Sequence, residues 1–169
     1  MFNFILLKLN TMKKLILVRH AKSDWPEETS DFDRPLADKG LLDALKMSKF
    51  LKNNDIVIDY FVSSPAVRAL ATCKIFNQTY NSTFVTDEKL YNPSENNFES
   101  VIYDLNDDLN SVAFFSHNNG ISNFANSISE DIFHFPTCGV AGFQIECDSW
   151  AQFDGADKKL LFFYEPGKI

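Results

Sequence analysis

The sequence predicts an α/β fold, a three-layer α/β/α sandwich with a mostly parallel central sheet. Two continuous apolar runs, 14–18 and 111–115, are typical of strands buried on both faces. Helix-length segments separate the expected strands, and this alternation favours helices on both faces of one sheet. The chain has 169 residues, of which 45% are hydrophobic and 23% charged, as in a globular protein of one domain.

The first expected elements form a strand, a loop and a helix. The strand covers residues 14–18, and residues 25–34 are a loop because they combine a proline with several acids. Residues 38–52 have the spacing of an amphipathic helix. The residues expected on its buried face are Leu41, Ala44, Leu45, Ser48 and Leu51.

The rest of the chain continues the alternation. Pro65 suits the first turn of a helix, and Ser94 suits the start of another. The further expected elements are a strand at 59–62, a helix at 66–76, a weak strand at 84–85, a helix at 94–105, a strand at 111–115, a helix at 120–128, and strands at 140–145 and 160–164.

Charge and apolar patterning exclude several classes of protein. Sixteen Lys and Arg against 23 Asp and Glu give a net charge of −7, which disfavours a nucleic-acid partner. No apolar run approaches the roughly 20 residues of a membrane span, so no membrane association is expected. Lysines interrupt the apolar N-terminus, unlike a signal peptide. We interpret residues 1–11 as an N-terminal extension and 12–169 as a single domain.

The three cysteines, Cys73, Cys138 and Cys147, have no CxxC spacing. An odd number without this spacing argues against a disulfide framework and a zinc site. Reduced thiols in a cytoplasmic protein are the simpler interpretation.

Arginine and histidine side chains follow three of the expected strands. Arg19 and His20 end the first strand, Arg68 lies about one helical turn after the second, and His117 follows the run at 111–115. The carboxyl ends of parallel strands meet at one edge of a sheet, so these four side chains should converge. Two guanidinium groups offer forked donors for phosphate oxygens. The sequence therefore predicts a phosphate site that needs neither a metal nor another cofactor.

A neutral imidazole in such a site is a competent nucleophile at phosphorus, and a second histidine can donate to the phosphoryl oxygens. Each residue alone is a weak signal, because a single histidine at a strand end is more often structural. The prediction depends on all of them sharing one structural context. His134 lacks that context and receives no role, and the acidic runs at 27–33 and 104–108 are interpreted as solvated loops.

The segment from Leu17 to Ser23 resembles the defining motif of the histidine phosphatase superfamily, which has the phosphoglycerate mutase-like fold. Ala21 stands where the common motif has glycine, and with Trp25 this variant resembles the SixA-type phosphohistidine phosphatase branch. Further segments fit that branch in order and spacing. They are 33–36 with Gly40, 63–69 with Thr72, 116–118, 136–139 and 161–163.

The resemblance implies a role for each matching residue. His20 matches the nucleophile that becomes phosphorylated, and His117 matches the second histidine of the phosphate pocket. The residues that match phosphate-binding or pocket-rim positions are Arg19, Arg68, Lys22 and Ser23. Two departures are visible. Ala37 stands where relatives often have a helix-capping Ser or Thr, and Ser116 replaces a glycine common before the second histidine.

Larger members of the superfamily use a carboxylic acid to protonate the leaving alcohol, whereas the SixA-type branch is described as lacking it. Glu88 and Glu95 flank the segment that resembles the region supplying that acid. An imidazole, with a reference pKa of about 6.5, leaves without such help more easily than an alkoxide. We therefore expect a metal-independent cytoplasmic phosphatase that forms a phosphohistidine intermediate and acts on phosphohistidine in proteins.

Two alternatives remain open at this point. One is a phosphatase of small phosphoesters or phosphoramidates that uses the same site. The other is a phosphate-dependent binding module with little turnover, which the complete set of two histidines and two arginines argues against.

Overall fold

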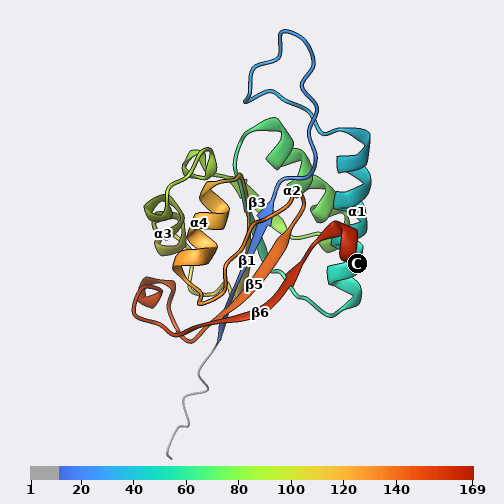
Figure 1. The fold of residues 1–169 in the computed structure, drawn as a ribbon. Helices are drawn as coiled ribbons and strands as arrows, with labels where there is room; N and C mark the ends of the chain where they lie inside the picture. Colours follow the sequence, from blue (N-terminus) through green and yellow to red (C-terminus); the bar gives the residue numbers. More distant parts are fainter. Residues whose placement is uncertain (1–11) are drawn as a thin grey trace, which may run out of the picture.

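Six strands form one mixed sheet in the order β3-β2-β4-β1-β5-β6 (Figure 1). The computed structural model describes residues 12–169, and the expected extension at 1–11 lies outside them. Strands β1 to β4 are parallel, whereas β5 and β6 form an antiparallel margin beside β1. The strands are β1 (Lys13–Arg19), β2 (Tyr60–Ser63), β3 (Thr83–Thr86), β4 (Ser111–Ser116), β5 (Val140–Ile145) and β6 (Lys158–Tyr164).

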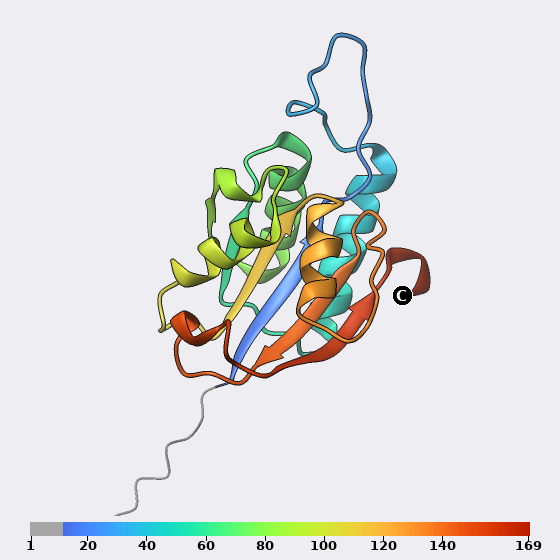
Figure 2. The ribbon, with the colours of Figure 1, turned by 60° about the vertical axis from the view of Figure 1, so that its left-hand side comes forward.

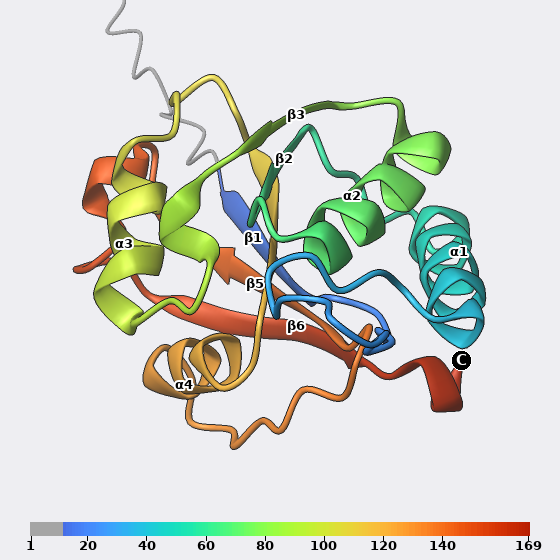
Figure 3. The same cartoon turned by 90° about the horizontal axis from the view of Figure 1, so that it is seen from above.

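Two helices cover each face of the sheet, as expected for a three-layer sandwich. Helices α1 and α2 lie together on one face, and α3 and α4 lie on the other (Figure 3). The helices are α1 (Asp38–Asn53), α2 (Val67–Tyr80), α3 (Glu95–Tyr103) and α4 (Gly120–Ser127), and short 3-10 turns are η1 (Glu88–Leu90), η2 (Trp150–Gln152) and η3 (Pro166–Lys168). Within residues 12–169, no helix is both long and apolar enough to cross a membrane.

The alternation of side chains along β1 explains why this strand is apolar throughout. Leu15 and Leu17 belong to the core beneath α3 and α4, whereas Ile16 and Val18 belong to the core beneath α1 and α2. Successive side chains of a strand point to opposite faces, so a strand covered on both faces needs apolar residues at every position. The same pattern makes every residue of β4 buried.

Two details of the helices differ from the sequence-based expectation. Leu41 is 45% exposed, while Gly40 and Met47 are buried in its place on α1. The reason is a close approach between α1 and the segment after β1, because a Cβ at Gly40 would lie 2.0 Å from the carbonyl oxygen of Lys22. The expected first-turn role of Pro65 is also wrong, since α2 begins at Val67.

The long loop between β1 and α1 projects from the edge of the sheet where the parallel strands end (Figures 1 and 2). The base of the loop is closed by a hydrogen bond of 3.0 Å from the amide of Asp24 to the carbonyl of Pro35. The carbonyl of Phe32 accepts a bond of 3.0 Å from the amide of Val67 at the start of α2. This contact brings the residue before Phe32, Asp31, beside the first turn of α2.

Candidate active site

A cavity of about 540 Å³ lies beyond the carboxyl ends of β1, β2 and β4. This is the position expected for a ligand site in a sheet of this kind. The structure brings together the six residues predicted for the phosphate site, which are His20, His117, Arg19, Arg68, Lys22 and Ser23. The described lining residues are Arg19, His20, Lys22, Ser23, Asp31, Arg34, Arg68, Tyr91, Asn92, His117, Asn118 and Thr137.

His20 presents one nitrogen as a lone-pair donor. Its Nδ1 lies 2.8 Å from the carbonyl oxygen of Ala21, and a carbonyl only accepts, so Nδ1 carries the proton. Its Nε2 accepts a hydrogen bond of 3.2 Å from Nε of Arg68. Burial, with smaller contributions from the charges of Arg68 and Arg19, lowers the pKa of His20 to about 4, although the hydrogen bond to the Ala21 carbonyl opposes this shift. His20 is therefore neutral near pH 7, with an unprotonated Nε2.

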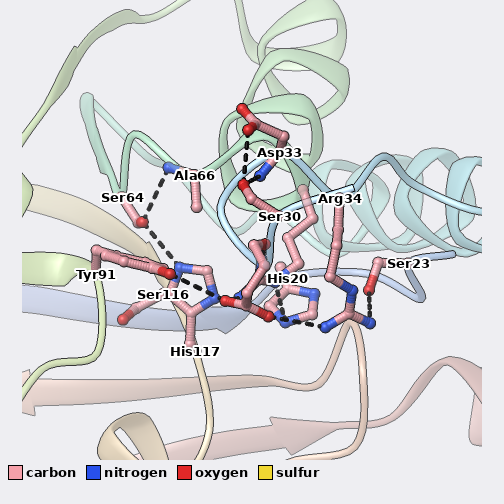
Figure 4. A network of polar contacts seen from close by, with 12 residues as sticks. His20, Ser23, Ser30, Asp33, Arg34, Ser64, Ala66, Tyr91, Ser116 and His117 are labelled. Atoms are coloured by element: carbon pink, nitrogen blue, oxygen red, sulfur yellow. Dashed lines mark hydrogen bonds and ion pairs between the residues drawn. The ribbon is translucent and has the colours of Figure 1, made fainter. Parts of the chain in front are cut away.

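Oγ of Ser64 contacts Nε2 of His117 (Figure 4). Oγ of Ser64 accepts from the amide of Ala66 at 3.3 Å and lies 2.8 Å from Nε2 of His117. The serine hydroxyl can then donate to Nε2, which leaves the proton of His117 on Nδ1. Burial, with smaller contributions from His20 and Arg68, lowers the pKa of His117 to about 3.

Two buried donors of the cavity residues have no hydrogen-bond partner within the described part of the chain: Nδ1 of His117 and Nε of Arg19. Nη1 of the same Arg19 donates to the carbonyl of Phe135 at 2.7 Å. A buried donor without a partner costs about 1–3 kcal/mol. A bound anion can satisfy both donors, and its oxygens would meet two more cationic groups in Arg68 and Arg34.

Hydrogen bonds of two consecutive backbone amides fix the position of His20 directly after β1. Its amide donates to the carbonyl of Ser116 at 3.0 Å, and the next amide, that of Ala21, donates to Oγ1 of Thr72 at 3.0 Å. Oγ1 of Thr72 donates in turn to the carbonyl of Arg68. Ser116, which stands where relatives often have glycine, uses its buried hydroxyl to bind the carbonyl of Leu90 at 2.8 Å.

The loop acid Asp31, interpreted from the sequence as part of a solvated run, is partly exposed but also lines the cavity. Its carboxylate pairs with Arg68 at 3.0 Å and Arg34 at 3.1 Å, and accepts from the hydroxyl of Tyr91 at 3.0 Å. Burial would raise the pKa of Asp31, but the hydrogen bonds from Arg34, Tyr91 and Arg68 outweigh it and lower that pKa.

Sequence reasoning assigned no role to Arg34 or Tyr91, although both line the cavity. Each had a usable signal, because Arg34 stands in the segment 33–36 that carries the family resemblance, and Tyr91 stands in the segment between Glu88 and Glu95 that resembles the region supplying the acid. Arg34 donates to Oγ of Ser23 at 2.8 Å and stacks 4.1 Å from the ring centre of Trp25 (Figure 4 shows the contact with Ser23).

Glu88 and Glu95, the two residues considered as acids, do not line the cavity, and Asp31 is the one carboxylate among its described lining residues. Within residues 12–169, no group of three or more His, Cys, Asp or Glu side chains is placed to hold a metal ion. The cysteines are free and buried, and burial raises the pKa of Cys73 and of Cys138 to about 12. Thiols of this kind are unreactive.

The chain is similar to known proteins in sequence and in structure. A 2,3-bisphosphoglycerate-dependent phosphoglycerate mutase of Pelagibacter ubique is 42% identical over 71 residues, which are 40% of this chain and 30% of the mutase. The chain thus matches less than a third of that relative's length.

Solved structures match over more of the chain. A protein of Agrobacterium tumefaciens assigned as phosphohistidine phosphatase SixA has a TM-score of 0.78 and 24% identity, covering 92% of this chain and 99% of that one. The protein histidine phosphatase SixA complexed with tungstate has a TM-score of 0.79 and 19% identity, covering 91% and 97%. These similarities establish the phosphoglycerate mutase-like fold.

A family-wide sequence profile matches residues 15–119, which span the chain from β1 to the loop after β4 and include both cavity histidines and both predicted arginines. The chain belongs to the histidine phosphatase superfamily, branch 1.

Proposed function

We propose that this protein is a metal-independent phosphatase that removes phosphate from phosphohistidine in other proteins through a phosphohistidine intermediate on His20. The observation that carries the proposal is the neutral His20, whose Nε2 keeps its lone pair while the Ala21 carbonyl holds the proton on Nδ1. This nitrogen lies among arginine and histidine donors in the cavity. A nucleophile with matched donors for the phosphoryl oxygens is the arrangement that phosphoryl transfer requires.

The reaction proceeds in two displacements. Nε2 of His20 forms a bond to phosphorus while the bond from phosphorus to the leaving nitrogen breaks, and that nitrogen keeps the electron pair. A water oxygen then bonds to phosphorus, the bond to Nε2 breaks, and inorganic phosphate forms. Arg19, Arg68 and His117 stabilise the phosphoryl oxygens in both steps, and Lys22 and Ser23 lie at the rim.

The charge state of Asp31 supports phosphohistidine as the substrate. A general acid must hold a proton at the working pH, but the pKa of Asp31 is lowered by its donors, so its carboxylate is ionised. An alkoxide leaving group would receive no proton from it. The imidazole of phosphohistidine leaves as a neutral ring when its other nitrogen is protonated, so it needs no acid from the enzyme.

A protein substrate is supported by the likeness to the protein histidine phosphatase SixA. The second candidate is a phosphatase of small phosphoesters or phosphoramidates, which the match to a phosphoglycerate mutase favours. Both candidates use the same cavity and differ in the leaving group.

Specificity constants for a phosphohistidine protein, an aryl phosphate and an alkyl phosphate separate these candidates. We expect phosphohistidine to be the best substrate, the aryl ester to be intermediate and the alkyl ester to be the poorest, because leaving-group basicity increases in that order. Addition of a chelator should leave the rates unchanged. An alkyl ester hydrolysed as fast as phosphohistidine would contradict the proposal.

Three variants test the assigned roles in the same assay. His20→Ala should abolish turnover because it removes the covalent route, and Arg68→Ala should lower kcat by on the order of 10²–10³. His134→Ala is the matched control, since His134 is exposed and does not line the cavity. Wild-type activity in His20→Ala would show that another group is the nucleophile.

A further inference from the structure

Asp31 holds the groups that a phosphate would need. Arg68, Arg34 and the hydroxyl of Tyr91 all direct hydrogen-bond donors to this one carboxylate. The two guanidinium groups can bind phosphate oxygens in the same forked geometry, and the hydroxyl can donate to either anion. The cavity residues therefore surround an anion that belongs to the chain itself.

The contacts of Asp31 with Arg68 are of two kinds. The backbone carbonyl of Asp31 accepts from Nη1 of Arg68, and its carboxylate accepts from Nη2 at 3.0 Å. The loop backbone is fixed nearby by the bond between Phe32 and Val67. The carbonyl contact can thus keep Arg68 in position when the carboxylate is absent or turned away.

The exposure of the two side chains indicates which partner can move. The side chain of Arg68 is only 5% exposed and also donates to His20, whereas that of Asp31 is 40% exposed. A phosphate that enters the cavity meets a fixed arginine and a carboxylate that has access to solvent. A phosphate bound to Arg68 would lie beside this carboxylate, and the two negative charges would repel each other, more strongly for a phosphate dianion than for a monoanion.

We propose that Asp31 is a resident anion that competes with phosphate for Arg68 and Arg34 and so weakens the binding of the phosphate product. This inference rests on the proposed function, because it takes the cavity to be the phosphate site. The carboxylate does not donate a proton or attack phosphorus. It limits how long the released phosphate occupies the cavity and thus limits product inhibition.

Calorimetric titration of the full chain with inorganic phosphate tests this role without any turnover. Asp31→Asn keeps the backbone carbonyl and the side-chain shape but removes the charge. We expect the Kd for phosphate to fall by about tenfold, the effect of removing one nearby charge partly screened by solvent. Asp31→Ser, which also removes the charge, should shift the Kd in the same direction and serves if the asparagine variant folds poorly.

Asp33→Asn is the matched control. It changes the net charge by the same amount on the same loop, but Asp33 bonds to Ser30 and does not line the cavity, so its Kd should equal that of the wild type. An unchanged or higher Kd in both Asp31 variants would overturn the inference, and a higher Kd would show that the carboxylate positions Arg68 instead. If neither the wild type nor any variant binds phosphate, the phosphate site itself is overturned. If the Asp31 variants bind phosphate more tightly but the wild type does not hydrolyse phosphohistidine, only the proposed function is overturned.

Discussion

Two buried neutral histidines should make the folded protein sensitive to mild acid. Burial lowers the pKa of His20 to about 4 and that of His117 to about 3, whereas an unfolded histidine titrates near 6.5. Between these values the unfolded chain binds more protons than the folded chain, so stability falls as the pH falls. The loss begins near pH 6.5 and continues until each folded histidine becomes protonated.

The size of the effect follows from the same values. At pH 5 both histidines are still neutral in the folded state, whereas this pH lies about 1.5 units below the pKa of 6.5 of an unfolded histidine. At 1.36 kcal/mol per unit, each histidine lowers the free energy of unfolding by about 2 kcal/mol relative to pH 7, and the pair by about 4 kcal/mol. That is a large part of the 5–15 kcal/mol typical of a domain.

Urea unfolding at pH 7, 6 and 5 measures this loss, in buffers without phosphate or other anions that fit the cavity. His20→Asn and His117→Asn each remove one titrating group and should each reduce the loss between pH 7 and 5 by about 2 kcal/mol. His134→Asn, which alters an exposed histidine, should behave as the wild type. If both cavity variants lose as much stability as the wild type, the histidines are not neutral in the folded protein and the argument for a neutral nucleophile fails.

Two further predictions concern single hydroxyl groups. Ser64→Ala should free the tautomer of His117, change the ¹⁵N shifts of its ring and lower kcat by about tenfold with little change in KM, a smaller loss than removal of a donor causes. The control Ser63→Ala alters a buried neighbour that bonds to a backbone carbonyl, and it should change neither kcat nor the ¹⁵N shifts. Unchanged ¹⁵N shifts in Ser64→Ala would contradict the role of Ser64. Ala37 precedes α1 in extended backbone geometry and supplies no side-chain cap, as the sequence predicted. Ala37→Ser should therefore stabilise the protein by about 1 kcal/mol and raise Tm by about 2–4 °C in thermal unfolding. An unchanged Tm would show that the new hydroxyl does not cap the helix.

The sequence by itself determined the layered α/β fold and the position of the site. The continuous apolar run of β1 reports burial on both faces, and the rule that parallel strands end at one edge places His20, Arg68 and His117 together. Both signals are local in the chain, so no knowledge of tertiary contacts was needed. The motifs resemble those of the histidine phosphatase superfamily, and the family profile confirms this assignment.

The direction of the last two strands and the orientation of α1 depend on tertiary contacts. Nothing local to β5 indicates that it pairs antiparallel to β1. Leu41 turns outward because Gly40 packs against the carbonyl of Lys22, a contact between segments that are distant in the chain. Helical periodicity alone placed Ala44, Ser48 and Leu51 correctly in the core. It did not predict the burial of Gly40 and Met47.

Only the tertiary structure decided the charge environment of the site. Asp31 stands in an acidic loop that looks solvated in the sequence, yet it bonds to Arg68, which is 37 residues away. The tautomers of His20 and His117 likewise depend on the acceptor or donor at their other ring nitrogen, the Ala21 carbonyl and the Ser64 hydroxyl. The physical reason is that charge and hydrogen bonding act through space over a few ångströms, while sequence patterns report which residues are buried and not which groups meet.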